Sequence, residues 1–246
     1  MNLLRSEWIK LWSVRSHQVM LGLAVLLSMG FAGLVSAVVP NDPEQLGPDF
    51  DPFTFSLSGA GIATLLVGSV GVLLMSGEYR HGTTRVTFAA EPHRARVLVA
   101  KGAVGFAAGV LVGLLAVPLA LATGLTIFSL RDFDVSVGGG TFWRAAVGAV
   151  VLFGLNALIG LGLGAILKSA AAGIVVFAIA NVLVEPILDA LFGRWARFLP
   201  FRAGAEIISR DPVDPGLGWA LGLAYFSAWI AALLVIGGLL VSRRDA

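Results

Sequence analysis

Residues 145–190 read AAVGAVVLFGLNALIGLGLGAIL, then Lys168 and Ser169, then AAAGIVVFAIANVLVEPILDA. Both apolar runs have the length, about 20 residues, that a helix rising ~1.5 Å per residue needs to cross a hydrocarbon core of ~30 Å. Because only Lys168 and Ser169 separate the runs, the second helix must turn back directly on the first. This stretch therefore predicts a tight antiparallel hairpin of two transmembrane helices.

Apolar runs of similar length occur along the whole chain. None has a Lys, Arg or His in its interior, where each would cost ~2.5–3.5 kcal/mol on insertion scales. We expect helices rather than barrel strands, because lipid offers no partner to backbone amides and no alternating apolar pattern is present. The prediction is an all-α membrane protein in which residues 1–246 form a single transmembrane domain. Its six spans are residues 18–39, 56–75, 102–128, 145–167, 170–190 and 217–241, with a long loop at 76–101 and a hairpin at 191–216.

The composition excludes several classes of protein. Hydrophobic residues make up 57% of the chain and charged residues 13%, about half of the ~25% that is usual in soluble domains. A soluble enzyme, a nucleic-acid-binding protein and a disordered chain all need more charge than this. The chain contains no Cys, which excludes disulfides, thiolate metal sites and a cysteine nucleophile.

The basic residues predict the orientation, because cytoplasmic loops carry an excess of Lys and Arg. With the N-terminus inside, most of the 17 basic residues are cytoplasmic, whereas the first outer loop, residues 40–55, has none. Four arginines in the last outer loop oppose this trend, at positions 194, 197, 202 and 210. We therefore expect both termini in the cytoplasm. The cytoplasmic set is Arg5, Lys10, Arg15, Arg80, Arg85, Arg94, Arg96, Lys101, Lys168, Arg243 and Arg244.

The segment before the first span has the pattern of an amphipathic helix. Apolar side chains recur at i, i+4, i+7 and i+8, and a cation lies on the opposite face. These residues are Leu4, Trp8, Leu11 and Trp12, with Lys10 opposite. Such a helix suits the inner headgroup layer of a membrane. The pattern fits a simple anchor, and it also fits a lever that joins the bundle to a cytoplasmic partner.

The loop after the second span is predicted to contain a short helix. Gly82 ends the helix of the span, and Thr83 or Thr84 can cap a new one. That helix must stop by Pro92, since a proline disfavours helix at the residue before it. Apolar side chains such as Phe88 would then face the cytosol and need a partner. Topology enforcement and binding of anionic lipid would explain the cations of this loop, but not a helix with such defined ends.

The last outer loop is predicted to form a helical hairpin over residues 191–216. Leu191, Trp195, Phe198 and Leu199 make another amphipathic stripe before Pro200, and a second short helix is expected over residues 202–209. We expect the hairpin to lie in the outer leaflet, with its arginines at lipid phosphates.

No catalytic constellation is present in the sequence. The three histidines, His17, His81 and His93, are all predicted at the inner side, so they cannot form a Ser–His pair within the membrane. There is no glycine-rich loop ending in Gly-Lys-Ser/Thr, and hence no phosphate cradle for a nucleotide. No carboxylate cluster within the spans suits a metal. The chain is therefore expected to be neither an enzyme nor a holder of a cofactor or metal.

One ionisable residue lies within a predicted span. Glu185 stands next to Pro186 in the outer half of the fifth span, with Asn181 one turn away on the same face. A carboxylate at this depth is expected either to face a transport pathway or to make a structural hydrogen bond. Asn156 in the fourth span is expected to make a helix–helix contact.

Glycines spaced by four residues predict where helices pack closely. They lie on single faces of the third, fourth and sixth spans. The positions are Gly105, Gly109 and Gly113, then Gly160 and Gly164, then Gly218 and Gly222.

Several of these features together resemble the type-2 ABC exporter permeases, in particular compact actinobacterial ones. A helix reading Ser6-Glu7-Trp8-Ile9-Lys10-Leu11 precedes six spans. The loop after the second span reads Glu78-Tyr79-Arg80-His81-Gly82-Thr83-Thr84, followed by Pro92, Arg94 and Lys101. A Leu199-Pro200 pair stands in the last outer loop.

The resemblance implies a permease subunit in the bacterial inner membrane that works with separate partners. These would be an ATP-binding cassette ATPase, which binds ATP and Mg²⁺, and a second permease copy, identical or different. The N-terminal helix and the loop after the second span would act as connecting and coupling helices. By the same resemblance, residues at or beside the ATPase surface would be Glu78, Arg80, Gly82, Thr83, Arg85, Phe88 and Pro92.

The scarcity of charge within the spans indicates an amphiphilic cargo, such as a drug, a lipid or a hydrophobic peptide. Two other functions remain open at this point. One is a secondary transporter driven by an ion gradient, for which only Glu185 and Pro186 provide the expected midplane features. The other is a membrane sensor or assembly protein that transports nothing.

Overall fold

In the computed structural model the described residues are 3–41, 46, 50–80, 82, 93–210 and 216–244, and all of their regular elements are helices. The first half contains α1 (Leu3–Ser13), α2 (Arg15–Val38), α4 (Pro52–Ser56), α5 (Ser58–Arg80) and α7 (Arg94–Leu130). The second half contains α8 (Gly139–Leu167), α9 (Ala170–Ile179), the π-helical η1 (Ala180–Val184), α10 (Glu185–Phe192), the 3₁₀-helical η2 (Gly193–Phe198), α11 (Pro200–Ala205) and α12 (Trp219–Arg244).

Within the described residues, six helical segments are long and apolar enough to cross a membrane, as predicted. They are α2, α5, α7, α8, the continuous segment Ala170–Phe198, and α12. The helix ends differ from the predicted ones. α5 continues to Arg80 and α7 begins at Arg94, rather than at residues 75 and 102. The predicted ends marked the limits of the apolar runs. The helices themselves extend beyond these limits, because polar and charged residues can continue a helix outside the hydrocarbon layer.

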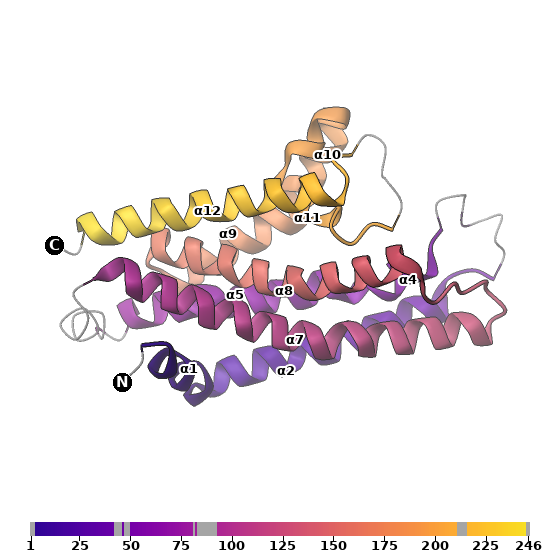
Figure 1. Cartoon of the computed structure of the whole chain (residues 1–246), viewed down its shortest axis with the longest axis horizontal. Coiled ribbons are helices and arrows are strands. Elements are labelled where there is room, and N and C mark those ends of the chain that lie inside the picture. Colours follow the sequence, from indigo (N-terminus) through magenta and orange to yellow (C-terminus); the bar gives the residue numbers. More distant parts are fainter. Residues whose placement is uncertain are drawn as a thin grey trace.

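The long helices run side by side along the long axis of the molecule (Figure 1). The first and last described residues lie at the same end, together with the ends of α5 and α8 and the start of α7. We call this the terminal end, and the other the opposite end. α1 lies at the terminal end, and α10, η2 and α11 form the hairpin near the opposite end.

The α8–α9 hairpin turns as its sequence predicts. Lys168 adopts a left-handed conformation with φ 53°, which reverses the chain directly after α8. Ser169 then caps α9, its hydroxyl accepting a hydrogen bond from the Ala172 amide at 3.3 Å.

α5 packs centrally, against α2, α8 and α9, through glycines. A Cβ on Gly160 of α8 would lie 1.8 Å from the carbonyl oxygen of Gly68 in α5, and one on Gly71 would lie 2.1 Å from that of Ala157. α7 approaches α8 in the same way at Gly109, whose Cβ would lie 2.6 Å from the Phe153 carbonyl oxygen. The predicted close packing of small residues is therefore confirmed at these glycines. The prediction is wrong for Gly218, which precedes α12 with φ +73° and whose Cβ would meet no atom within 4 Å.

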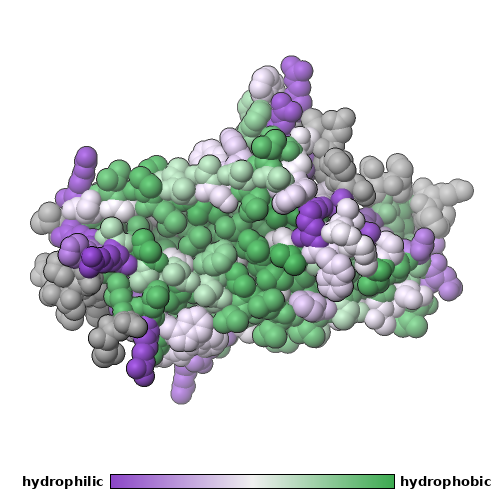
Figure 2. All heavy atoms as spheres, in the orientation of Figure 1, coloured by the Kyte–Doolittle hydropathy of each residue, from purple (hydrophilic) through white to green (hydrophobic). Residues whose placement is uncertain are grey.

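On the face shown in Figure 2, apolar residues cover the middle of the bundle, and hydrophilic residues gather toward its two ends. In the most apolar windows of α5, α7 and α8, 67%, 56% and 61% of the residues are buried. In α2, the Ala170–Phe198 segment and α12 the shares are only 28%, 17% and 22%. A water-soluble monomer does not leave so much apolar surface uncovered. Lipid or another protein chain must cover these three segments.

The hairpin between the last two spans differs from the predicted one. α10 ends at Phe192, Gly193 has φ +50°, and a 3₁₀ turn leads to Pro200. The second helix is α11, which starts at Pro200 rather than at residue 202, because the fixed φ of a proline suits the first turn of a helix. The predicted stripe points away from the protein, with Leu191 73% and Trp195 59% exposed.

Candidate functional site

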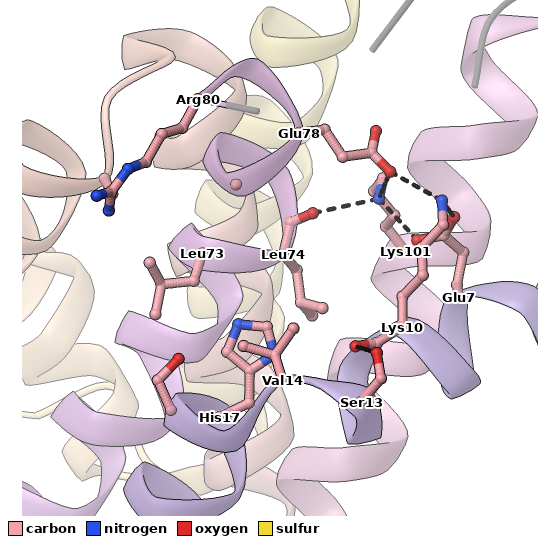
Figure 3. A pocket seen from close by; sticks show the side chains of 13 residues that line it. Glu7, Lys10, Ser13, Val14, His17, Leu73, Leu74, Glu78, Arg80 and Lys101 are labelled. Atoms are coloured by element: carbon pink, nitrogen blue, oxygen red, sulfur yellow. Dashed lines mark hydrogen bonds and ion pairs between the residues drawn. The ribbon is translucent and has the colours of Figure 1, made fainter. Parts of the chain in front are cut away.

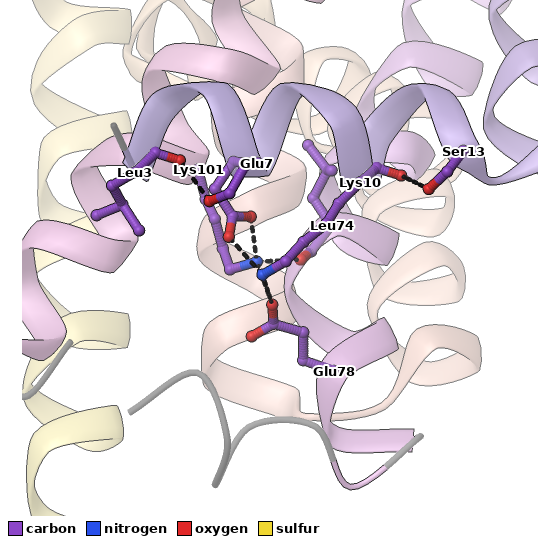
Figure 4. Close-up of polar contacts among 8 residues, drawn as sticks. Leu3, Glu7, Lys10, Ser13, Leu74, Glu78 and Lys101 are labelled. Carbon is purple, nitrogen blue, oxygen red and sulfur yellow. Dashed lines mark hydrogen bonds and ion pairs between the residues drawn. The ribbon is translucent and has the colours of Figure 1, made fainter. Parts of the chain in front are cut away.

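Four charged side chains meet at the terminal end, where α1 crosses α5 and α7 (Figure 4). The Lys101 ammonium of α7 donates to Glu7 Oε2 of α1 at 2.7 Å and to Glu78 Oε1 of α5 at 2.8 Å. Its third hydrogen bond goes to the Leu74 carbonyl oxygen at 3.2 Å. Lys10 of α1 donates to Glu7 Oε1 at 2.6 Å and to Glu78 Oε1 at 2.9 Å. Two carboxylates and two ammonium groups thus form one neutral charge cluster.

The centre of the charge cluster is closed to solvent. The Lys101 and Glu7 side chains are each 1% exposed, and that of Glu78 is 11% exposed. A buried charge is strongly unfavourable unless it is paired and hydrogen-bonded. Lys101 meets both conditions, because its three N–H donors all have acceptors. The contact therefore fixes α1 to the last turns of α5 and to the first turns of α7.

Lys10 lies at the outer edge of the cluster, with its side chain 46% exposed. Partial burial by itself lowers the pKa of Lys10, but hydrogen bonds and charge attraction from Glu7 and Glu78 outweigh that effect. The pKa of Lys10 is consequently raised above its ordinary value, and the group stays charged at neutral pH.

Further contacts tie the helices on either side of residues 81–93 to the rest of the terminal end. Arg94, the first residue of α7, donates from Nη1 to the carbonyl oxygens of Val241 and Ser242 in α12, both at 2.9 Å. A cation at these last carbonyls is favourable for the helix. The Lys168 ammonium lies 4.8 Å from the centre of the Tyr79 ring, which links the α8–α9 turn to the last turn of α5.

A cavity of about 540 Å³ adjoins the charge cluster, between the start of α2 and the end of α5 (Figure 3). Its apolar wall includes Val14, Leu73 and Leu74. His17 is buried beside it, with Nδ1 3.2 Å from the Leu11 carbonyl oxygen. Arg80 also lines the cavity; among the described residues it has no hydrogen-bonding or ionic partner, and it is exposed. The arrangement places the exposed Arg80 guanidinium and the neutral charge cluster beside an apolar recess.

The structure describes only part of the predicted coupling surface. Glu78 belongs to the charge cluster and Arg80 lines the adjoining cavity. Gly82 has φ +66°, a left-handed conformation that ends the helix as predicted. The remaining predicted residues of that surface lie outside the described residues; they are Thr83, Arg85, Phe88 and Pro92.

A helix is present where the interfacial helix was predicted, and it is α1. The Trp8 and Trp12 rings pack edge to face, with centroids 6.0 Å apart, and Trp12 is 40% exposed. Its Lys10, placed by the sequence on the face opposite the apolar stripe, forms ion pairs with Glu7 and Glu78.

Sequence reasoning missed the central pair of the charge cluster, Glu7 and Lys101. From the sequence, Glu7 was assigned only to the N-terminal motif, and Lys101 only to the cytoplasmic cations and to the motif of the loop after the second span. A signal was available, because Lys101 stands between Val97 and Val104 in an otherwise apolar run. A cation in that setting requires an anionic partner.

Glu185 and Asn181 do not act together in the structure. Glu185 is 8% exposed, and its two carboxylate oxygens accept hydrogen bonds from the amides of Phe201 and Arg202, both at 2.9 Å. It thereby caps α11 and makes the structural hydrogen bond that was one of its two expected roles. Asn181 lies in η1 and lines a separate cavity of about 210 Å³.

Glu206 is a second buried carboxylate that the sequence did not reveal, because it falls in a predicted outer helix. It is 2% exposed and directly follows α11. Within the described part of the chain, neither of its carboxylate oxygens accepts a hydrogen bond. A charge without a partner is unfavourable there.

Two arginines near the opposite end, Arg210 and Arg144, bind protein groups. Arg210 donates to Asp51 Oδ1 at 3.1 Å and to the Ser136 hydroxyl at 3.0 Å. Arg144 donates to the carbonyl oxygens of Ile207 and Ser209. For Arg210 this differs from the predicted contact with lipid phosphate, because Asp51 already supplies an anion.

The described residues contain no group of three or more His, Asp or Glu side chains that could hold a metal ion. Comparison with known proteins adds no relative: no family model matches the chain, and no curated protein matches it.

Proposed function

We propose that this protein is the permease subunit of an ATP-driven exporter of the type-2 ABC class, with both termini in the cytoplasm of a bacterial cell. A separate ATPase would power it, and a second permease copy would complete the pathway. The cargo would be amphiphilic. The observation that carries this proposal is the anchoring of both helices that flank residues 81–93.

The anchoring would make the terminal end suitable for receiving a mechanical force. Glu78 ties the end of α5 to α1 and α7, and Arg94 ties the start of α7 to α12. A partner that displaces residues 81–93 would therefore move four helices together instead of bending one loop. Since α5 and α7 reach the opposite end, such a displacement would extend across the membrane.

The uncovered apolar segments suit the proposed pairing of two permease copies. The α2, Ala170–Phe198 and α12 segments leave most of their apolar windows exposed, although lipid alone could cover some of that area. A transport pathway between two copies would need such a surface on each of them.

The test is reconstitution of the permease in liposomes with a candidate ATP-binding cassette ATPase from the same organism. We expect the two proteins to co-purify in a fixed ratio, and ATP hydrolysis to increase when the permease is present. Phe88→Asp and Gly82→Pro should reduce ATP-dependent export while membrane insertion remains normal. Proline requires φ near −65°, which the +66° of Gly82 excludes.

Val137→Asp is the matched control, because Val137 is 66% exposed in the segment between α7 and α8 at the opposite end. It should leave hydrolysis and export unchanged. Export by the permease alone, driven by an ion gradient, would identify a secondary transporter instead. Membrane insertion without an ATPase partner or any transport would favour a sensor or assembly protein.

A further inference from the structure

The 210 Å³ cavity lies inside the helix bundle, away from the charge cluster. α5, α8, η1, α11 and α12 all contribute to its wall. It is smaller than the ~300–1,000 Å³ of a site for a drug-sized molecule, so it suits a small molecule or one end of a larger one. We therefore considered which chemical groups its wall would accept.

An amide in the wall has an unused hydrogen-bond acceptor. Asn156 of α8 is 5% exposed, and its Nδ2 donates to the Leu152 carbonyl oxygen at 2.9 Å. Its Oδ1 is buried and accepts no hydrogen bond in the described part of the protein. Leaving such an acceptor unpaired costs about 1–3 kcal/mol, which a donor on a bound molecule would recover.

Two other polar side chains face the same cavity. Asn181 makes no side-chain hydrogen bond among the described residues, and it lies in η1, whose wider π-helical turn interrupts the fifth span. Such turns occur frequently at functional sites. The Thr64 hydroxyl donates to the Gly61 carbonyl oxygen at 2.8 Å, which leaves its lone pairs able to accept.

The rest of the wall is apolar. Phe153, Phe201 and Phe226 line the cavity, with the last two rings 6.3 Å apart, and none of the described residues that line it is charged. A charged ligand group would thus have no counter-ion there and would be strongly disfavoured. An uncharged molecule with an apolar body would pack against the rings.

We propose that this cavity binds a neutral amphiphile that carries a hydroxyl or amide N–H, which donates to Oδ1 of Asn156. The apolar part of the molecule packs against the three phenylalanines. The proposal that the cavity binds such a molecule does not depend on how transport is powered. Its identification as a cargo site rests on the proposed exporter function.

The binding test uses the purified full-length permease in nanodiscs, without an ATPase, and two photoreactive probes. One is a diazirine derivative of decanol, and the other is its methyl ether, which lacks the hydroxyl donor. Labelled peptides are identified by mass spectrometry. We expect the alcohol to label α8 and α11 about tenfold more than the ether at equal concentration, as ~1.4 kcal/mol would give.

Two variants separate binding from folding. Asn156→Leu should abolish the preference for the alcohol. Gly61→Leu should reduce labelling by both probes, because a Cβ at Gly61 meets no atom within 4 Å and the side chain can enter the mouth of the cavity without a clash. Gly30→Leu is the matched control, since Gly30 is an exposed glycine in α2 with equally free space.

Equal labelling by both probes in the wild type, no labelling of α8 and α11, or unchanged labelling in Gly61→Leu would each overturn the proposal. If Asn156→Leu does not fold, the proposal is still tested by Gly61→Leu and by the comparison of the alcohol with the ether in the wild type. Selective labelling together with a failure to find an ATPase partner would retain the binding site and reject the exporter function. ATP-coupled export without selective labelling would retain the exporter function and reject the binding site.

Discussion

At the residue scale, Lys101 shows how the protein retains a charge among apolar helices. The ammonium group is closed to solvent, but each of its donors has an acceptor, two of them carboxylates. Lys10 contacts the same carboxylates from the outer edge of the cluster, where water can replace it. The ammonium group of Lys101 should therefore contribute much more to stability than that of Lys10.

We expect Lys101→Met to lower the free energy of unfolding by about 3–5 kcal/mol, because it leaves buried carboxylates without their central partner. Lys10→Met is the matched control and should lower it by no more than about 1 kcal/mol, as is usual for exposed ion pairs. Denaturant titration of the detergent-solubilised protein measures both. Equal effects of the two substitutions would contradict the structural role of Lys101.

At the element scale, the hairpin near the opposite end depends on one carboxylate. Glu185 begins α10 and also accepts hydrogen bonds from the first turn of α11, so it holds the two helices together. Glu206, at the other end of α11, has no such function among the described residues.

Glu185→Leu should therefore free the start of α11, since it leaves the amides of Phe201 and Arg202 without acceptors, at about 1–3 kcal/mol each. Trypsin should then cleave after Arg197 and Arg202 faster than in the wild type. Glu206→Gln should leave the cleavage rate unchanged and should not reduce stability, because neither carboxylate oxygen of Glu206 has a hydrogen bond, among the described residues, that the substitution would break. Faster cleavage in both variants, or in neither, would contradict this difference.

The α5–α8 contact is the second feature at this scale. Gly160→Ala should destabilise the protein by at least ~1–3 kcal/mol, because its Cβ would lie 1.8 Å from a backbone oxygen and the helices must separate. Gly30→Ala, in open space on α2, should instead be neutral or stabilising by up to ~1 kcal/mol. Thermal unfolding of the two variants tests whether close packing or helix propensity determines the change in stability at each glycine.

The sequence predicted the helices much better than the contacts between them. Spans and close-packing glycines follow from local composition and spacing, so the α8–α9 turn and the Gly160 contact could be expected. The Glu7–Lys101 pair joins positions 94 residues apart, and no local pattern specifies such a pairing. The η1 turn was equally unpredictable, because the single polar residue in Ala180–Val184, Asn181, does not distinguish a π-helical turn from an α-helical one.

At the scale of the whole molecule, the distribution of charge sets the expected orientation. The arginines that opposed the positive-inside trend include Arg210, which is paired with Asp51 in the structure. A cation neutralised by its own protein has less influence on topology than a free one. The terminal end is therefore still expected to face the cytoplasm.

The absence of cysteine makes this orientation directly testable. A membrane-impermeant maleimide should label Thr141→Cys, near the opposite end, in intact cells. Ser242→Cys, at the terminal end, should react only after the cells are permeabilised. Both side chains are exposed in the structure, so accessibility within the protein is matched. The opposite labelling pattern would reverse the topology and exclude a cytoplasmic ATPase at the terminal end.

The length of α7 has a mechanical consequence. Its 37 residues extend for roughly 55 Å, well beyond a hydrocarbon core of ~30 Å, and they form one unbroken helix. A stiff rod of this kind converts a small sideways shift at one membrane face into a tilt at the other. Pro118 is the one residue in it that cannot donate a backbone hydrogen bond, so any flexing should concentrate there and leave the longer arm, from Arg94 onward, straight.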